Sequence, residues 1–124
     1  MKYVKLFEEH TDEDTMLNGY LTTALWTEES ELGSEFDIKD ISSNSVDQAK
    51  KDCDRFKMLV GSTIISKYDL FTIGHDFWLT RNNHGAGFWD GDYDDEDEKI
   101  LMAITDTFGT KLMYEGDDGT IYID

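Results

Sequence analysis

Apolar residues recur at helical spacing from Met16 to Leu25, and this pattern predicts a first helix. Thr11 stands before it as a candidate N-cap, and three acidic residues follow where the dipole of a helix favours anions. The pattern fades near Glu28. The segment 29–43, with a glycine and several serines, is predicted to be a loop.

A second helix is predicted from Ser45, whose side chain can form a capping box with Gln48. Apolar residues follow at spacings of three and four as far as Ile64, and Gly61 is a position where this helix can end early. Cys53 lies on the apolar stripe, so we expect it to pack in the core rather than to act as a nucleophile.

From His75 the spacing of apolar residues changes from helical to alternating. Residues 76–81 are predicted to be a strand, 82–85 a turn and 87–90 the returning strand. Together they form a first predicted hairpin.

Apolar residues from Ile100 to Phe108 predict a third helix that ends at Gly109. Segments 111–115 and 120–123 form a second predicted hairpin around a Gly-Asp-Asp-Gly turn. Strands and helices do not alternate along the chain. The predicted fold class is therefore α+β, a small antiparallel sheet of two hairpins packed against about three helices.

The 124 residues suit one domain, 1–124, with seven Phe, six Tyr and three Trp available for its core. Acidic residues outnumber basic ones by 28 to 11, which gives a formal net charge of −17. Contacts with phosphates need a basic surface, so we expect no direct binding to nucleic acid and none to anionic membranes. The expected partners are basic proteins, although high solubility is a plainer explanation of the same charge.

The charge also permits imitation of DNA. A domain of this length spans about 35 Å, and a duplex of that length has about 20 negative charges. The net charge of −17 is comparable. Carboxylates gathered on one face could therefore enter a basic groove in place of phosphates.

The expected compartment is a cytoplasm. No apolar stretch of signal-peptide length precedes Glu8, and no window approaches the roughly 18 apolar residues of a membrane span. Cys53 is the only cysteine, which excludes an internal disulfide.

The segment 74–90 is the densest mixture of polar and aromatic residues, and it is the candidate binding site. Arg81 could act as a fork donor to a small anionic or polar ligand, with turn amides as further donors. The alternative is a scaffold, in which the rings are core and the polar residues serve the turn. The candidate binding residues are His75, Asp76, Trp78, Arg81, Asn83, His84 and Trp89.

An enzyme is not expected, because no catalytic constellation is recognisable. On a strand the neighbours His75 and Asp76 point to opposite faces and cannot pair as base and orienter. The chain has no phosphate-binding glycine loop, no nucleophile elbow and no cysteine pair for zinc.

The run from residue 90 to residue 98 holds seven carboxylates in nine residues. A calcium loop that starts at Asp90 would need Gly in place of Asp95 and Glu in place of Leu101. We therefore expect no dedicated metal site and no cofactor, and predict a solvated loop whose last acids serve the next helix. The candidate acidic surface comprises Asp90, Asp92, Asp94, Asp95, Glu96, Asp97 and Glu98.

The segment HDFWLTRNNHGAGFWD at 75–90 resembles the hallmark of a family of small uncharacterised bacteriophage and prophage proteins. The resemblance extends to YLTTALW at 20–26, DIKDIS at 37–42, DCDRF at 52–56 and YEGDDGTIYI at 114–123. Where the family tends to have one Asn and a Gly before its His, this chain has Asn82 and Asn83. The resemblance implies a phage origin and expression in a bacterial cytoplasm, and it transfers no catalytic residue.

In a phage context, the acidity favours a binding protein that targets and inhibits a host protein, either a defence protein or one that binds nucleic acid. DNA mimicry is one means by which it could do so. The alternative is a small-ligand or nucleotide-binding module built on the 74–90 hairpin.

Overall fold

The computed structural model describes residues 12–28, 32 and 36–124. Its helices are α1 (Asp12–Thr27), α3 (Ser43–Val60), α4 (Ser62–Ile65), α5 (Leu70–Arg81) and α6 (Asp95–Asp106). Two short 3-10 helices, η1 (Ile38–Asp40) and η2 (Phe88–Asp90), and two strands, β2 (Met113–Glu115) and β3 (Ile121–Ile123), complete the described elements. The coarse α+β prediction is confirmed, but in these residues the sheet has only two antiparallel strands rather than two hairpins.

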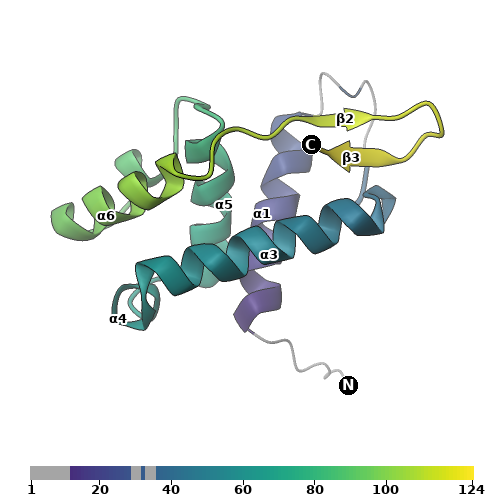
Figure 1. Cartoon of the computed structure of the whole chain (residues 1–124). Coiled ribbons are helices and arrows are strands. Elements are labelled where there is room, and N and C mark those ends of the chain that lie inside the picture. The colour runs from purple at the N-terminus through teal and green to yellow at the C-terminus, as the bar shows by residue number, and fades with distance from the viewer. Residues whose placement is uncertain (1–11, 29–31, 33–35) are drawn as a thin grey trace.

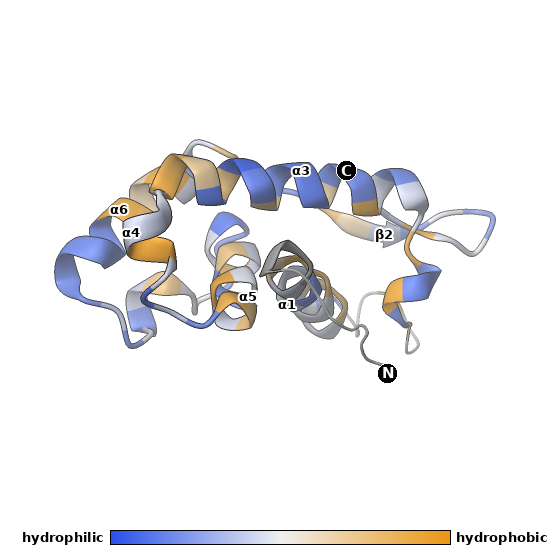
Figure 2. Ribbon diagram, turned by 90° about the horizontal axis from the view of Figure 1, so that it is seen from below, coloured by the Kyte–Doolittle hydropathy of each residue, from blue (hydrophilic) through white to orange (hydrophobic). Residues whose placement is uncertain are grey.

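Helices α1 and α5 lie side by side, and α3 crosses one face of the pair (Figures 1 and 2). Helix α6 lies at one end of this arrangement, and the β2–β3 hairpin lies at the other end. Within the described residues, no helix is long and apolar enough to cross a membrane.

Two glycines let the backbones of α1 and α5 touch. A Cβ atom on Gly19 would collide with the carbonyl oxygen of Phe71, and one on Gly74 would collide with the carbonyl oxygen of Met16. Only glycine fits at both positions, because a neighbouring backbone cannot yield as a flexible side chain can. This contact fixes α5 against α1 and places the residues that follow Gly74.

Helix α3 begins at Ser43, two residues before its predicted start. The side chain of Ser42 caps it by accepting a hydrogen bond from the amide of Ser45 at 3.1 Å. Gly61, with φ of 95°, ends the helix as predicted. The buried face of α3 presents Phe56, which stacks on Phe77 of α5 at a centroid distance of 4.4 Å. Cys53 is fully buried on the same face, so its predicted core position is confirmed.

The predicted hairpin at 76–90 is wrong, because residues 70–81 form helix α5. The carboxylate of Asp69 caps this helix, accepting from the amide of Thr72 at 2.9 Å. Neighbours on several sides bury α5, including Asp76, Trp78 and Arg81. A helix enclosed on several sides has no single apolar stripe, so its sequence can imitate the alternation of a strand.

The predicted third helix and second hairpin are confirmed, whereas the predicted strand 87–90 is wrong, because residues 88–90 form η2. The first turn of α6 contains Asp95, Glu96, Asp97 and Glu98, where the helix dipole favours acids. Strand β2 pairs with β3 in the register Met113 to Ile123. The sheet joins the helices where the amide of Ser42 donates to the carbonyl of Ile121 at 2.8 Å. The predicted N-cap of the first helix, Thr11, lies outside the described residues, as do residues 29–31 and 33–35 of the predicted loop 29–43. Within the described part of that loop, residues 38–40 form η1 and Ser43 begins α3.

Candidate functional site

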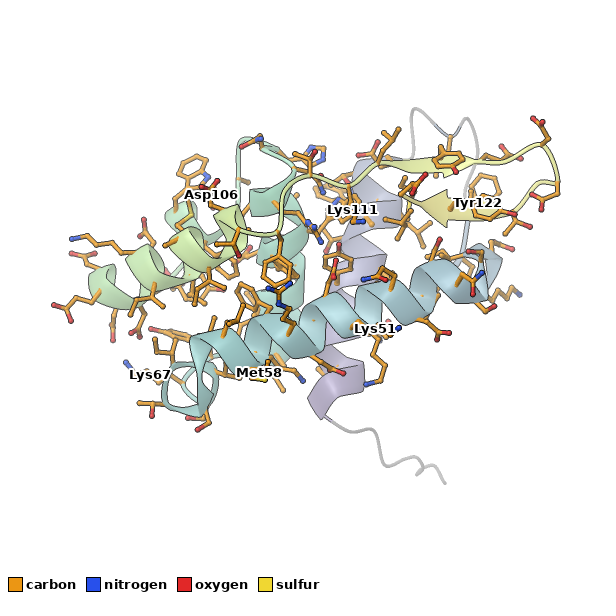
Figure 3. All side chains as sticks on the ribbon, in the orientation of Figure 1. Lys51, Met58, Lys67, Asp106, Lys111 and Tyr122 are labelled. Atoms are coloured by element: carbon orange, nitrogen blue, oxygen red, sulfur yellow. The ribbon has the colours of Figure 1, made fainter. Side chains whose placement is uncertain are left out.

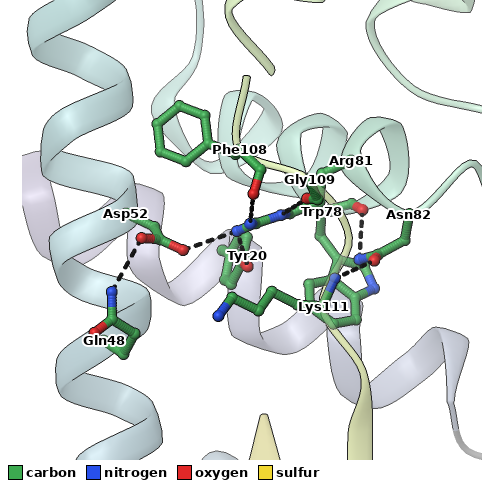
Figure 4. Close-up of polar contacts among 9 residues, drawn as sticks. All are labelled: Tyr20, Gln48, Asp52, Trp78, Arg81, Asn82, Phe108, Gly109 and Lys111. Atoms are coloured by element: carbon green, nitrogen blue, oxygen red, sulfur yellow. Dashed lines mark hydrogen bonds and ion pairs between the residues drawn. The ribbon is translucent and has the colours of Figure 1, made fainter. Parts of the chain in front are cut away.

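Arg81 lies in the core, and its side chain is only 1% exposed. The guanidinium donates hydrogen bonds of 2.8 to 3.0 Å to four groups, as Figure 4 shows: the Asp52 carboxylate, the Tyr20 hydroxyl and the carbonyls of Phe108 and Gly109. Four of its five possible donors are thereby engaged.

The rings of two phenylalanines also lie against this guanidinium. The Cζ atom of Arg81 is 5.3 Å from the ring centroid of Phe77 and 5.6 Å from that of Phe108. We refer to this group as the Arg81 cluster: Arg81, Tyr20, Asp52, Phe77, Phe108 and Gly109. It joins α1, α3, α5 and the segment after α6, so the predicted fork donor is part of the scaffold.

Trp78 is also core. Its side chain is fully buried, its indole nitrogen donates to the Thr27 hydroxyl at 2.9 Å, and its ring meets Tyr20 edge to face at 5.3 Å. The backbone carbonyl of Trp78 accepts from the side chain of Asn82 at 3.1 Å. Trp78 therefore joins α5 to α1 and has no exposed surface for a ligand.

Three other candidate residues lie in or after the turn that follows α5. Asn83 is exposed and has φ of 57°, a conformation that asparagine tolerates well. The Nε2 atom of His84 lies 3.4 Å from a carboxylate oxygen of Glu28 at the end of α1. Trp89, on η2, is 49% exposed. Asn83 lines a hollow of about 380 Å³ together with Arg81, whereas Trp78, His84 and Trp89 do not line it.

His75 and Asp76 do contact each other, because they lie on a helix rather than on a strand. The Nδ1 atom of His75 is 2.9 Å from Oδ1 of Asp76, and the Tyr93 hydroxyl donates to Oδ2 of Asp76 at 2.7 Å. Asp76 is buried, whereas the His75 side chain is 39% exposed. A carboxylate only accepts hydrogen bonds, so His75 donates from Nδ1 and keeps Nε2 free of this contact.

A hollow of about 510 Å³ opens beside Asp76. We call it the Asp76 hollow; it is lined by Tyr68, Asp69, Phe71, Thr72, His75, Asp76, Asp90, Gly91, Asp92 and Tyr93. Gly91 allows its rim to close on Tyr93, since a Cβ there would lie 2.7 Å from the tyrosine ring. Burial, followed by the hydrogen bond to Asp76, raises the pKa of Tyr93, so this tyrosine remains a protonated donor.

A second hollow of about 480 Å³ lies at the start of α6, and Tyr93 lines both. We call it the Lys67 hollow; its other lining residues are Lys67, Asp94, Asp95, Glu96 and Asp97. Lys67 lies at the α4 end of the molecule, far from Tyr122 in the hairpin (Figure 3). Figure 2 shows the adjoining first turn of α6 as strongly hydrophilic.

Within the Lys67 hollow, Asp97 is the most tightly held acid. It accepts from Lys67 at 2.7 Å and from the Tyr68 hydroxyl at 2.6 Å. These two hydrogen bonds lower the pKa of Asp97, and the same contact with Asp97 raises the pKa of Lys67. Tyr68 also accepts from the amide of Asp94 at 3.1 Å and thus fixes the start of α6.

Each of the two hollows is lined by four carboxylates, and Lys67 and His75 are their only basic lining residues among those the structure describes. We call these eight acids the acidic face: Asp69, Asp76, Asp90, Asp92, Asp94, Asp95, Glu96 and Asp97. Its chemistry suits cations. Among the usual nucleophilic side chains, the described lining of the Asp76 hollow includes no serine, cysteine or lysine. The hydroxyl of its one threonine, Thr72, donates to Asp69 at 2.9 Å.

The sequence pattern indicated His75, Asp76 and the acidic run 90–98, but not the residues that connect them. Tyr68, Asp69, Phe71 and Tyr93 were not predicted. A signal was present for Asp69, because an aspartate before an apolar segment is a typical helix N-cap. Tyr68 and Tyr93, whose rings are 4.7 Å apart, lie 25 positions apart in the chain, and no local pattern joins them.

In the part of the chain that the structure describes, no group of three or more His, Cys, Asp or Glu side chains could hold a metal ion. Another hollow lies between α1 and η1, lined by Trp26 and Phe36 among others.

The structure is a small, mainly helical α+β fold with an acidic face around η2 and the start of α6. Comparison of the chain with models of known protein families, with curated proteins and with solved structures gave no match.

Proposed function

We propose that this chain is a phage-encoded binding protein that uses its acidic face to bind, and thereby inhibit, a basic host protein. The observation that supports the proposal is the charge imbalance of the two hollows, where eight carboxylates face one lysine and one histidine. The phage origin rests on the resemblance of residues 75–90. The inhibitory role rests on that phage context.

The exposure of the acids favours contact with a partner. Asp92, Asp94, Asp95 and Glu96 are exposed, and only Asp94 has a described basic neighbour, Lys67 at 3.4 Å. Exposed charges of one sign accelerate the encounter with an oppositely charged partner and select against acidic ones. A defence or nucleic-acid-binding protein offers such a surface, since it must attract phosphates. DNA mimicry is the form of this proposal in which the acids enter a DNA-binding groove.

The observations do not favour the alternative of a nucleotide-binding module. The hairpin on which it depends is a helix, and Arg81 is held within the core. Two hollows border this segment. The Asp76 hollow is lined by four carboxylates, which repel phosphates, and in the hollow that Arg81 lines, the arginine side chain is only 1% exposed.

The test is a capture experiment with two charge-matched triple variants. The first, Asp92→Asn/Asp95→Asn/Glu96→Gln, neutralises part of the acidic face. The second, Asp47→Asn/Glu115→Gln/Asp117→Asn, removes equal charge from exposed residues on α3 and the hairpin. Each protein is immobilised and exposed to bacterial lysate at about 50 mM and about 300 mM salt, and the captured proteins are identified by mass spectrometry.

We expect basic, nucleic-acid-binding proteins to be captured by the wild type and the second variant but not by the first. Capture should fall steeply with salt, and added duplex DNA should compete if mimicry operates. Equal capture by all three proteins would refute the proposal. If the first variant fails to capture a partner and duplex DNA does not compete with that partner for the wild type, inhibition remains the proposal and DNA mimicry is excluded.

A further inference from the structure

We infer that the Asp76 hollow binds the guanidinium group of an arginine side chain on the partner protein. This inference rests on the proposed function and specifies the chemistry of one part of the acidic face. Three aromatic rings lie together with four carboxylates in a hollow of about 510 Å³, which is large enough for a side chain of this size.

The acids and rings of the hollow are suited to a cation that is both charged and flat. Tyr68 and Tyr93 have ring centroids 4.7 Å apart at an angle of 60°, and Phe71 adds a ring that is 38% exposed. A cation over such rings gains cation–π attraction in addition to its attraction to the carboxylates.

Asp76 gives the hollow a fixed negative group. Each of its two carboxylate oxygens has its own hydrogen-bond partner: His75 lies 2.9 Å from Oδ1, and Tyr93 lies 2.7 Å from Oδ2. Tyr93 donates as a neutral hydroxyl and leaves the charge of Asp76 in place. Fixed acceptors lose little freedom when a ligand binds, which favours binding at this point over binding by mobile surface acids.

The chain already holds one of its own arginines by the same combination of groups. In the Arg81 cluster, a guanidinium lies between an aspartate, a tyrosine hydroxyl and two phenylalanine rings. Arg55, the other arginine of the chain, also lies over Phe108, at 5.5 Å. Neither lines the Asp76 hollow, so an arginine bound there must come from another molecule.

Arginine fits better than lysine for physical reasons. A guanidinium is planar, stacks on rings, can bind a carboxylate through two parallel hydrogen bonds and is more weakly hydrated than an ammonium group. A divalent metal ion is a poorer fit, since the described residues offer no group of ligands that could hold one.

The test uses three blocked amino acids as probes: acetyl-arginine methylamide, its lysine analogue and its citrulline analogue, which keeps the shape of arginine without the charge. Binding is followed by the shifts of backbone amide signals in NMR spectra of the full chain. We expect the arginine probe to shift the signals of residues 68–76 and 90–93 in a saturable way. The lysine probe should bind more weakly, and the citrulline probe should produce no shift.

Two variants and two matched controls test the residues of the hollow. Phe71→Ala should weaken the arginine probe about two- to five-fold, the loss that corresponds to one exposed cation–π contact. Tyr114→Ala, which removes a ring of nearly equal exposure (39% against 38%) from the hairpin, should leave its affinity unchanged. Asp92→Asn should weaken the probe, and Asp117→Asn should not. The same spectra report whether each variant is folded.

The outcomes separate this inference from the proposed function. Absence of shifts from the arginine probe, or equal binding of the arginine and lysine probes that Phe71→Ala does not affect, overturns the arginine site. If partner capture still depends on Asp92, Asp95 and Glu96 in that case, the proposed function stands without it. If the probe binds as expected while the triple variant captures partners normally, the site stands and the proposed function fails.

Discussion

The Arg81 cluster and the Asp76 hollow are built from the same kinds of groups but differ in how the charge of their aspartate is balanced. Asp52 faces the guanidinium of Arg81 at 2.9 Å, and the arginine side chain is 1% exposed. Asp76 faces a tyrosine hydroxyl and a histidine, and three further carboxylates share its hollow. The first aspartate is neutralised by the chain itself, whereas the second leaves a negative surface.

Residues 75–90 contribute both to the core and to the Asp76 hollow. Within residues 75–90, Trp78 and Arg81 build the core, whereas His75, Asp76 and Asp90 line an acidic hollow. Residue type does not distinguish the core residues from the residues of the hollow, since both regions combine aromatic rings with charged side chains. The two regions differ in whether a cation of the chain lies beside the aspartate: Arg81 lies beside Asp52, whereas no arginine or lysine among the described residues lines the Asp76 hollow.

The largest effect is expected from breaking the Arg81 cluster. Arg81→Ala should lower the free energy of unfolding by about 3–5 kcal/mol, because it leaves Asp52 without its cation in a largely buried position. Arg81→Lys should also destabilise, since lysine keeps the charge but loses the planar fork. Urea denaturation measures both. Arg55→Ala, which removes an exposed guanidinium over the same Phe108 ring, is the control, with an expected loss of about 0.5–1 kcal/mol. Equal losses for Arg55 and Arg81 would contradict the assignment of Arg81 to the scaffold.

A smaller effect is expected at the Asp76 hollow. Asp76→Ala should cost about 1–3 kcal/mol, because the partly buried Tyr93 hydroxyl loses its acceptor. Asp92→Ala, on the exposed rim, should change stability by no more than about 0.5 kcal/mol. Thermal unfolding of both variants gives the comparison. If Asp92→Ala proved as costly as Asp76→Ala, the distinction between a held acid and a rim acid would be wrong.

The smallest effect should appear in the pH dependence of the Lys67 hollow. Hydrogen bonds from Lys67 and Tyr68 lower the pKa of Asp97 below its ordinary 3.8. A carboxyl whose pKa is lower in the folded state stabilises the fold above its unfolded-state pKa, and this contribution is lost as the pH falls through the folded-state pKa. The stability lost in Asp97→Asn should therefore be constant near neutral pH and should shrink below pH 3.8.

Urea denaturation of the wild type and Asp97→Asn over a series of acidic pH values measures this difference. The effect should be modest, since Lys67 is 43% exposed and solvent screens the pair. Asp94→Asn is the control: Asp94 lies 3.4 Å from the same lysine but is 75% exposed, so a smaller loss of stability at neutral pH is expected. If the stability difference between the wild type and Asp97→Asn did not change with pH, the ion pair between Lys67 and Asp97 would not contribute to stability.

Local patterns predicted the elements whose apolar residues face one neighbour. Helices α3 and α6 each have one buried face and a strong amphipathic pattern, and the β2–β3 hairpin also buries one face, so their periodicity is readable. Helix α5 contacts α1 and α6, packs against α3 through Phe77 and Phe56, and is buried on several sides, so its periodicity is lost. The N-cap at Asp69 was the remaining local signal for this helix.

The candidate site was predictable only in part, because its residues come together through the fold. The acids of the run 90–98 are evident from composition. The rings of Tyr68 and Phe71 join them only because α5 begins beside η2 and α6, a placement that depends on the backbone contact at Gly19 and Gly74. The partners of Arg81 lie 27 to 61 positions away in the chain, so neither its burial nor its role could be inferred locally.

Cys53 has a practical consequence for studies of how this molecule opens. It is the single cysteine of the chain and has no exposed surface, and burial raises the pKa of its thiol. A thiol reagent can therefore modify it only after α3 has moved away from α1 and α5. The rate of modification under native conditions measures how often α3 separates from the pair. The chain thus contains a built-in kinetic reporter, one helical turn from Phe56 and next to the aspartate that holds Arg81.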